Sequence, residues 1–208
     1  MTHRTSPRPA LDHAAARRLL LKASAGLLVL PLTARAALAA SPESYVTSLA
    51  NQVMALARSG QSGRALKSRF VSLLTRSANM HAIARFALGK YRRKMPRSMQ
   101  SEYYRLVIDY IAGLFVYYRK DLAASKLVIK RTTRRGKWIT VDTDLVFANG
   151  AKSPVKWRIT GSGSYRVGDV NIKGIWLSLR MRDKFVSILN RSNGDFGALM
   201  AYLRENSA

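Results

Sequence analysis

Few residues in this sequence have the chemistry for catalysis or metal binding. The chain of 208 residues contains no cysteine, which excludes disulfide scaffolds, thiolate zinc sites and cysteine nucleophiles. Beyond residue 40 the only histidine is His81, and the sequence offers it no second metal ligand and no catalytic partner. We therefore interpret His81 as a structural or solvent-edge residue. Nucleotide-binding glycine motifs and a nucleophile elbow are also missing, since Gly161-Ser162-Gly163 is typical of a hairpin turn.

Asp142 and Asp144 are the best candidates for acid–base chemistry, because they lie two residues apart on a predicted strand. Paired carboxylates need burial that separates their pKa values. Their apolar neighbours alternate with them, which places both carboxylates on the solvent face of the strand. We expect them to pair across the sheet with Lys137 or Lys156. For Asp169 we expect a structural hydrogen-bonding role.

Basic residues dominate the charge of the chain. There are 36 Lys and Arg against 11 Asp and Glu, a formal charge of +25 with a pI near 11.3, so the protein attracts anionic partners. One basic run is Lys90-Tyr91-Arg92-Arg93-Lys94, and a second surrounds a predicted hairpin at residues 130–137. Only Tyr91 and Trp138 lie among these charges, too few aromatic residues for base stacking. The clusters predict contact with anionic membrane surfaces or acidic proteins, and no nucleic acid partner.

The first 39 residues have the three parts of a bacterial secretory signal. A basic segment precedes the apolar stretch 19–32, and small residues follow it up to Ala37-Leu38-Ala39. The stretch is shorter than the roughly 20 residues of a membrane span. We expect cleavage after Ala39, export to the periplasm, and a mature domain 40–208 with no cofactor. Arg17-Arg18 leaves both the general and the twin-arginine export route open. Removal of six basic residues and one acid lowers the charge from +25 to +20.

The first half of the mature chain is predicted to be helical. Ser41 followed by Pro42 predicts the start of a helix that ends before Gly60. A second helix is predicted at 66–74, and a third from Asn79 to a stop at Gly89. A fourth is predicted at 96–121, with an apolar arc so wide that it must be covered on two sides. Two more helices are expected at 181–189 and 196–203.

Between residues 125 and 175 the apolar period changes to two. This period predicts four strands, at 126–133, 137–148, 153–161 and 164–173, joined by short turns into an antiparallel meander. In the last strand Val167 and Val170 differ in phase, which predicts a β-bulge near Gly168-Asp169.

Several segments, in this order and spacing, resemble one known family. They are Ile83–Arg92, Val155–Ile159, Val167–Leu177 and the final helices from Arg182 to Leu203. On these segments the chain resembles the MlaC-like periplasmic phospholipid-binding proteins of the toluene-tolerance group, which are auxiliary components of ABC transporters. Trp176 departs from the pattern, which often has a small hydroxyl residue there, and we expect it to add bulk near the pocket.

The resemblance implies an α+β, NTF2-like fold, with helices packed on a curved four-stranded antiparallel sheet around an internal lipid cavity. It implies a carrier of a phospholipid with two acyl chains. The implied partners are an outer-membrane lipoprotein complex and an inner-membrane ABC transporter with a ring of MCE domains. Such a carrier would maintain the lipid asymmetry of the outer membrane and would need no catalytic residue.

The predicted pocket wall consists of apolar residues on the inward faces of helices and strands: Phe70, Leu74, Ile83, Phe86, Tyr110, Leu114, Val141, Leu145, Trp157, Val170, Ile172 and Leu177. Tyr91, Arg92 and Arg93 are expected near the lipid headgroup or on a docking face. Alternatives remain open at this stage: a carrier of another amphiphile such as a hopanoid, an NTF2-like isomerase or dehydratase, and a polyanion-binding module without a cavity.

Overall fold

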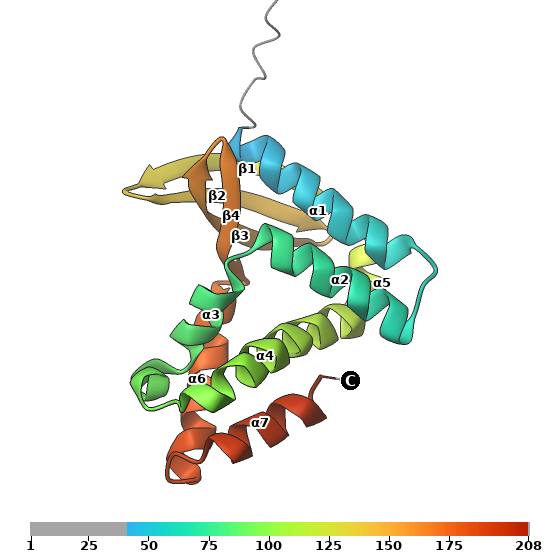
Figure 1. Cartoon of the computed structure of the whole chain (residues 1–208). Coiled ribbons are helices and arrows are strands. Elements are labelled where there is room, and N and C mark those ends of the chain that lie inside the picture. Colours follow the sequence, from blue (N-terminus) through green and yellow to red (C-terminus); the bar gives the residue numbers. More distant parts are fainter. Residues whose placement is uncertain (1–40, 208) are drawn as a thin grey trace, which may run out of the picture. The chain divides into compact units, whose positions relative to one another are not determined.

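The computed structural model describes residues 41–207, and the predicted secretory signal lies outside them. Six helical segments come first, followed by a sheet and two closing helices (Figure 1). The helical segments are α1 (Pro42–Arg58), α2 (Gly63–Ser77), α3 (Met80–Ala87), the 3₁₀ turn η1 (Gly89–Arg93), α4 (Arg97–Tyr117) and α5 (Arg119–Ala123). The sheet comprises β1 (Lys126–Arg135), β2 (Trp138–Val146), β3 (Lys152–Ser162), β4 (Ser164–Ile172) and β5 (Ile175–Trp176), and the last two helices are α6 (Leu177–Arg191) and α7 (Phe196–Glu205).

The starts of the early helices follow from local capping. Ser41 precedes α1, and its hydroxyl accepts a hydrogen bond from the Ser44 N–H at 3.1 Å. Asn79 caps α3 in the same way, accepting from the Ala82 N–H at 3.2 Å. Gly89 follows α3 with a φ of +53°, and a Cβ there would lie 2.8 Å from the Val186 side chain. Only glycine therefore lets η1 approach α6 so closely.

The helix predicted at 96–121 is in fact two helices. The backbone leaves the helical path at Tyr118, whose N–H donates to the carbonyls of both Leu114 and Val116. The chain then turns into α5, which packs on α1, where the Arg58 guanidinium donates to the Ala123 carbonyl at 3.3 Å. The single long helix was wrong because packing of α5 against α1 redirects the chain.

The strands form one antiparallel sheet in the order β1-β2-β3-β4-β5. This confirms the α+β class and the meander of four strands, and it adds β5, which is too short to show a period. The register places Val141 opposite Trp157, and Trp157 opposite Val170. Between β3 and β4 the register shifts at Gly168, which confirms the predicted bulge.

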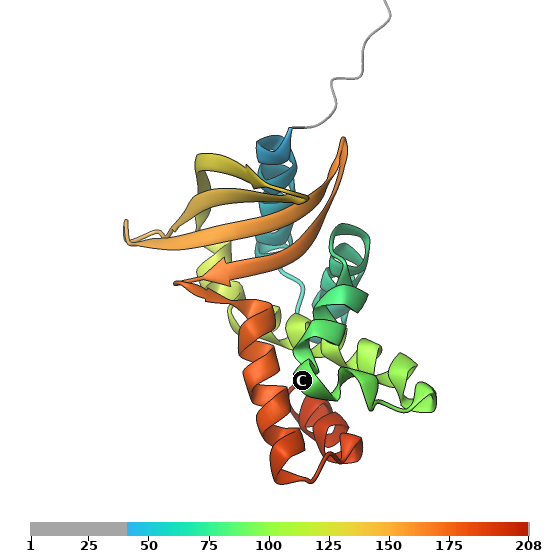
Figure 2. The ribbon, with the colours of Figure 1, turned by 90° about the vertical axis from the view of Figure 1, so that its left-hand side faces the viewer.

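The helices lie mainly on one face of the sheet, and the first turn of α6 reaches the other face, where the Ser178 N–H donates to Asp169. The helix α1 runs along β1 and β2, whereas α2, α3 and α6 contact β4 (Figure 2). Alternation directs Ile139, Val141 and Ile159 toward the helices, and all three are fully buried. The helical face of the sheet is called the inner face below, and the opposite one the outer face. Among residues 41–207, no helix is both long and apolar enough to cross a bilayer.

Candidate functional site

The inner face of the sheet is buried at one end and partly exposed at the other, called the open end below, where Leu145 and Ile172 are accessible although Thr143, Ser153 and Val155 beside them stay buried. On β2, Ile139 and Val141 are buried, whereas Leu145 on the same face is partly exposed. On β4, exposure rises from 5% at Val167 to 48% at Ile172. Buried inner faces are normal for such a sheet, so an exposed apolar end indicates surface that the helices do not cover. The open end of the inner face is the candidate site.

Trp157 stands in the middle of this face, on a central strand, and remains partly exposed. Its indole N–H donates to the Thr143 hydroxyl at 3.2 Å, and that hydroxyl donates to the Val155 carbonyl at 2.8 Å. Both polar groups are therefore satisfied. The Thr143 hydrogen bond holds the partly exposed Trp157 ring in one orientation.

The structure brings one subset of the predicted pocket residues together. Val141, Trp157 and Val170 form a row across three strands. Leu145 and Ile172 continue the same face toward its open end. On the helical side, Phe70 and Ile83 are buried in the core, and Leu74 and Leu177 pack against it. Leu114 on α4 is partly exposed.

Tyr110 belongs to a different part of the helical layer. Its ring lies 6.0 Å from that of Phe185 on α6 and 6.1 Å from that of Tyr202 on α7. Burial, together with a hydrogen bond to Tyr110, raises the pKa of Tyr202 to about 12. Tyr110 therefore contacts α6 and α7, and the aromatic contacts that fix it do not involve the sheet.

Phe86 is also separated from the row on the sheet. It is 44% exposed, and the Arg182 guanidinium lies 5.4 Å from the centre of its ring. The neighbouring Tyr91 is buried, and its hydroxyl donates to the Asn190 side chain at 3.0 Å, a contact that joins η1 to α6. Arg92 and Arg93 on the same turn are exposed.

The outer face carries the carboxylates. Asp142 accepts from Arg131 at 2.7 Å and lies 3.4 Å from the Lys156 ammonium, whereas Asp144 pairs with Lys130 at 3.3 Å. The expected pairing with Lys156 is confirmed, and neither aspartate pairs with Lys137. Partial burial acts to raise the pKa of Asp142, but the Arg131 hydrogen bond and the Lys156 charge outweigh it and the net pKa is lowered. Ion pairing in this form suits a structural role.

Asp169 has the structural role expected of it. Its carboxylate is buried and accepts hydrogen bonds from both the N–H and the hydroxyl of Ser178, at the first turn of α6. The bulge at Gly168 thereby directs the Asp169 side chain toward the N-terminus of α6, which it caps.

Trp176, which was expected to add bulk near the pocket, lies away from the candidate site. Trp176 lies opposite Asn171 in the register, and the Arg158 guanidinium is 3.8 Å from its ring centre. Arg158 also lies over Trp138, and strand alternation places both residues on the outer face. The added bulk of Trp176 is therefore on the far side of the sheet from the candidate site.

Sequence reasoning missed several members of the candidate site. Thr143 and Val155 share the inner face with Trp157, and Ile175 lies opposite Ile172 and is 46% exposed. The phase of Val141 and Leu145 already predicted an inward Thr143. No comparable signal existed for Ile175, because β5 has only two residues.

His81 is exposed, with its ring 4.4 Å from that of Tyr104. Within the described part of the chain, no three acidic or histidine side chains are grouped in a way that could hold a metal ion.

Comparisons with known proteins agree on one relationship. A family model described as "MlaC protein" matches residues 47–205. Among solved structures, the chain is similar to a phospholipid-binding protein from Ralstonia solanacearum, determined in complex with a phospholipid. The two share 16% sequence identity with a TM-score of 0.65, over 78% of this chain and 94% of the other. At this identity the likeness establishes the fold. No curated protein matches the sequence.

Proposed function

Because the chain belongs to the MlaC family, we propose that it is a phospholipid carrier that works in the periplasm. The observation that carries this proposal is the open apolar end of the inner face, from Trp157 and Val170 to Ile172. These apolar side chains are accessible on a face of the sheet where Ile139, Val141 and Ile159 are buried. An acyl chain laid along them would complete the apolar layer between the sheet and the helices.

The energetics suit a carrier. Burial of one methylene group contributes about 0.8 kcal/mol, so two acyl chains of about 16 carbons contribute on the order of 20 kcal/mol before the costs of ordering. Non-covalent affinities saturate near that value. Spontaneous release would then be very slow, and a carrier of this kind depends on docking to a partner for loading and unloading.

The proposed route follows from the family. The protein would collect or deliver phospholipid at an outer-membrane lipoprotein complex and at an inner-membrane ABC transporter with an MCE ring, and so would maintain lipid asymmetry. A binding role without catalysis is consistent with the paired carboxylates of the outer face. The secretory signal proposed at residues 1–39 would bring the chain to this compartment.

Native mass spectrometry of the purified protein, followed by solvent extraction and lipid identification, tests the proposal. We expect a stoichiometric phospholipid with two acyl chains. Recovery of a polycyclic lipid would identify a carrier of another amphiphile, and recovery of no lipid after expression in a lipid-rich host would refute the carrier. N-terminal sequencing of the same sample tests cleavage after Ala39.

A further inference from the structure

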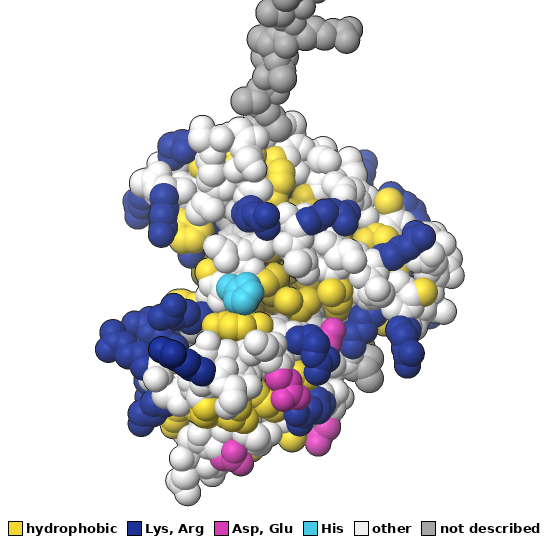
Figure 3. Space-filling view, viewed as in Figure 1, with side chains coloured by type: hydrophobic (Ala, Val, Ile, Leu, Met, Phe, Trp, Pro, Cys, Tyr) yellow, Lys and Arg dark blue, Asp and Glu magenta, His cyan; other side chains and the backbone are white. Residues whose placement is uncertain are grey.

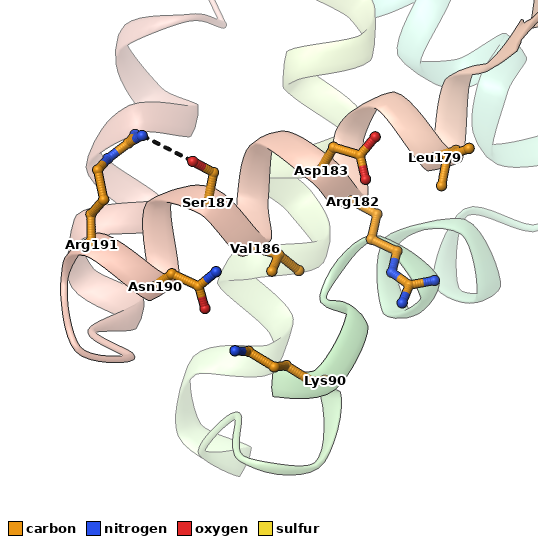
Figure 4. Close-up of a pocket in the computed structure, with 8 residues that line it drawn as sticks. All are labelled: Lys90, Leu179, Arg182, Asp183, Val186, Ser187, Asn190 and Arg191. Atoms are coloured by element: carbon orange, nitrogen blue, oxygen red, sulfur yellow. Dashed lines mark hydrogen bonds between the residues drawn. The ribbon is translucent and has the colours of Figure 1, made fainter.

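A groove runs between α6 and η1, outside the inner face of the sheet (Figure 4). Its volume is about 630 Å³, and it is lined by Lys90, Leu179, Arg182, Asp183, Val186, Ser187, Asn190 and Arg191. Three of these residues are cations and one is an acid, so the groove carries net positive charge. Leu179 and Val186 give it an apolar part.

The cations of the groove are available to a ligand. Within residues 41–207, neither Lys90 nor Arg182 forms an ion pair with an acid, although ion pairs occur on the sheet and on α4. Arg191 donates to the Ser187 hydroxyl at 2.9 Å, a neutral partner that leaves its charge uncompensated. Lys90 and Lys94 both lie over the Tyr91 ring, at 5.3 and 5.8 Å. An external anion would compensate these charges.

Exposed apolar side chains border the same groove. Phe86 is 44% exposed and lies under Arg182, and Leu179 is 40% exposed. In the space-filling view, Lys and Arg side chains gather over the α3–η1 end of the helices, whereas the acidic side chains visible there lie toward α4 and α7 (Figure 3). The groove therefore combines several positively charged side chains with a few exposed apolar residues at its edge.

We propose that the α6–η1 groove docks the protein on the surface of an anionic membrane. The cations are long, exposed side chains from two different elements, and they suit a fluid layer of phosphate headgroups that can rearrange around them. The Phe86 ring suits the interfacial depth just below those headgroups. This docking serves the carrier function proposed above, because it holds the protein where its cargo is found.

Co-sedimentation with lipid vesicles tests the docking. The wild-type protein is compared on vesicles of phosphatidylcholine alone and on vesicles that also contain phosphatidylglycerol. We expect binding to the second kind only, with a loss of binding as salt is raised to about 0.5 M. Binding to both kinds equally, or to neither, would overturn the proposal.

Matched double variants locate the contact. Lys90→Glu/Arg182→Glu reverses two charges in the groove, and Arg134→Glu/Arg135→Glu makes the same change in net charge at the β1–β2 hairpin. Each basic residue at an anionic surface adds to the attraction, so we expect the groove variant to lose at least tenfold in vesicle partitioning and the hairpin variant far less. Equal losses would refute the groove.

Two further measurements on these samples keep the outcome interpretable. Thermal melting followed by circular dichroism establishes that both variants fold. Native mass spectrometry of each variant reports its bound lipid: a groove variant that keeps its lipid and loses vesicle binding separates docking from cargo binding. If the wild-type protein also carries no lipid, the carrier function is refuted, and the vesicle experiment then tests membrane docking alone.

Discussion

The guanidinium of Arg158 lies 3.8 Å from the centre of the Trp176 ring, on the outer face of the sheet. Arg158 also lies 5.6 Å from the centre of the Trp138 ring, so that one cation contacts two indoles. This stack joins β2, β3 and β5 on the outer face, next to the point where the chain passes from β5 into α6. We therefore expect Trp176 to stabilise the sheet.

Trp176→Ala is expected to lower the free energy of unfolding by about 1–2 kcal/mol, because the cation–π contact and part of the buried ring are lost. Bound lipid should be unchanged. Urea denaturation measures the first effect, and native mass spectrometry measures the second. Arg158→Met, which keeps much of the side-chain packing, should cost less. Loss of lipid from Trp176→Ala would show that the residue acts on the cargo after all.

Leu145 and Val146 are neighbours on β2 that face opposite sides of the sheet, and both are partly exposed. Leu145→Glu would place a carboxylate on the open inner face, where an acyl chain would desolvate it. We expect this variant to retain at most a tenth of the wild-type lipid content. Val146→Glu introduces the same charge one residue away, on the outer face, and should retain its lipid. Equal lipid contents in the two variants would contradict the proposed location of the cargo.

The helices and strands could be predicted where the signal is local. The hydroxyl of Ser41 caps α1 through a residue three positions away, and the alternation around Val141 fixes which side chains face inward. The break at Tyr118 has no such signal, since it depends on packing of α5 against α1. The two residues of β5 pair only because the turn at Gly174 returns the chain to β4.

The candidate site was predictable on the sheet and much less so on the helices. A strand has only two faces, so the period of two placed Trp157 and Val170 correctly on the inner one. A helix that packs between several layers has several apolar neighbours, and its apolar stripe does not predict which neighbour each side chain contacts. Tyr110 contacts rings of α6 and α7 and Phe86 lies beside Arg182, and their place in the pocket wall stays a prediction.

Gly168→Ala is expected to destabilise the protein by about 1–3 kcal/mol, because the new Cβ would lie 2.5 Å from the Trp138 ring. Because the Arg158 guanidinium lies 5.6 Å from the centre of this ring, a shift of the ring also disturbs that contact. Urea denaturation of the single variants and of Gly168→Ala/Trp138→Leu forms a double-mutant cycle. The cost of Gly168→Ala should fall by at least half in the Trp138→Leu background. The same cost in both backgrounds would mean that backbone conformation, and not the ring, demands glycine.

Asp169→Ala should cost about 1–3 kcal/mol of stability, because it leaves the buried Ser178 N–H without a partner at the start of α6. Asp169→Asn keeps one acceptor oxygen and should cost less. Ser178→Ala removes only the hydroxyl donor and should be the mildest of the three. Free energies of unfolding from urea titrations give this order, and a neutral Asp169→Ala would show that water replaces the cap.

Asp142 makes the stability of the sheet depend on pH. Its pKa is lowered from the ordinary value of 3.8, and its side chain is only 14% exposed between Arg131 and Lys156. A carboxylate with a depressed pKa stabilises the fold fully above its unfolded value, and this contribution is lost as the pH falls through the folded pKa. Because both cations are themselves exposed, we expect Asp142→Asn to cost only about 1 kcal/mol near pH 7 and almost nothing near pH 2. Urea denaturation at both values measures the difference, with the exposed Asp121→Asn as a control that should show little at either. A cost for Asp142→Asn that stays constant across this range would mean that shape, and not charge, makes the aspartate important at this position.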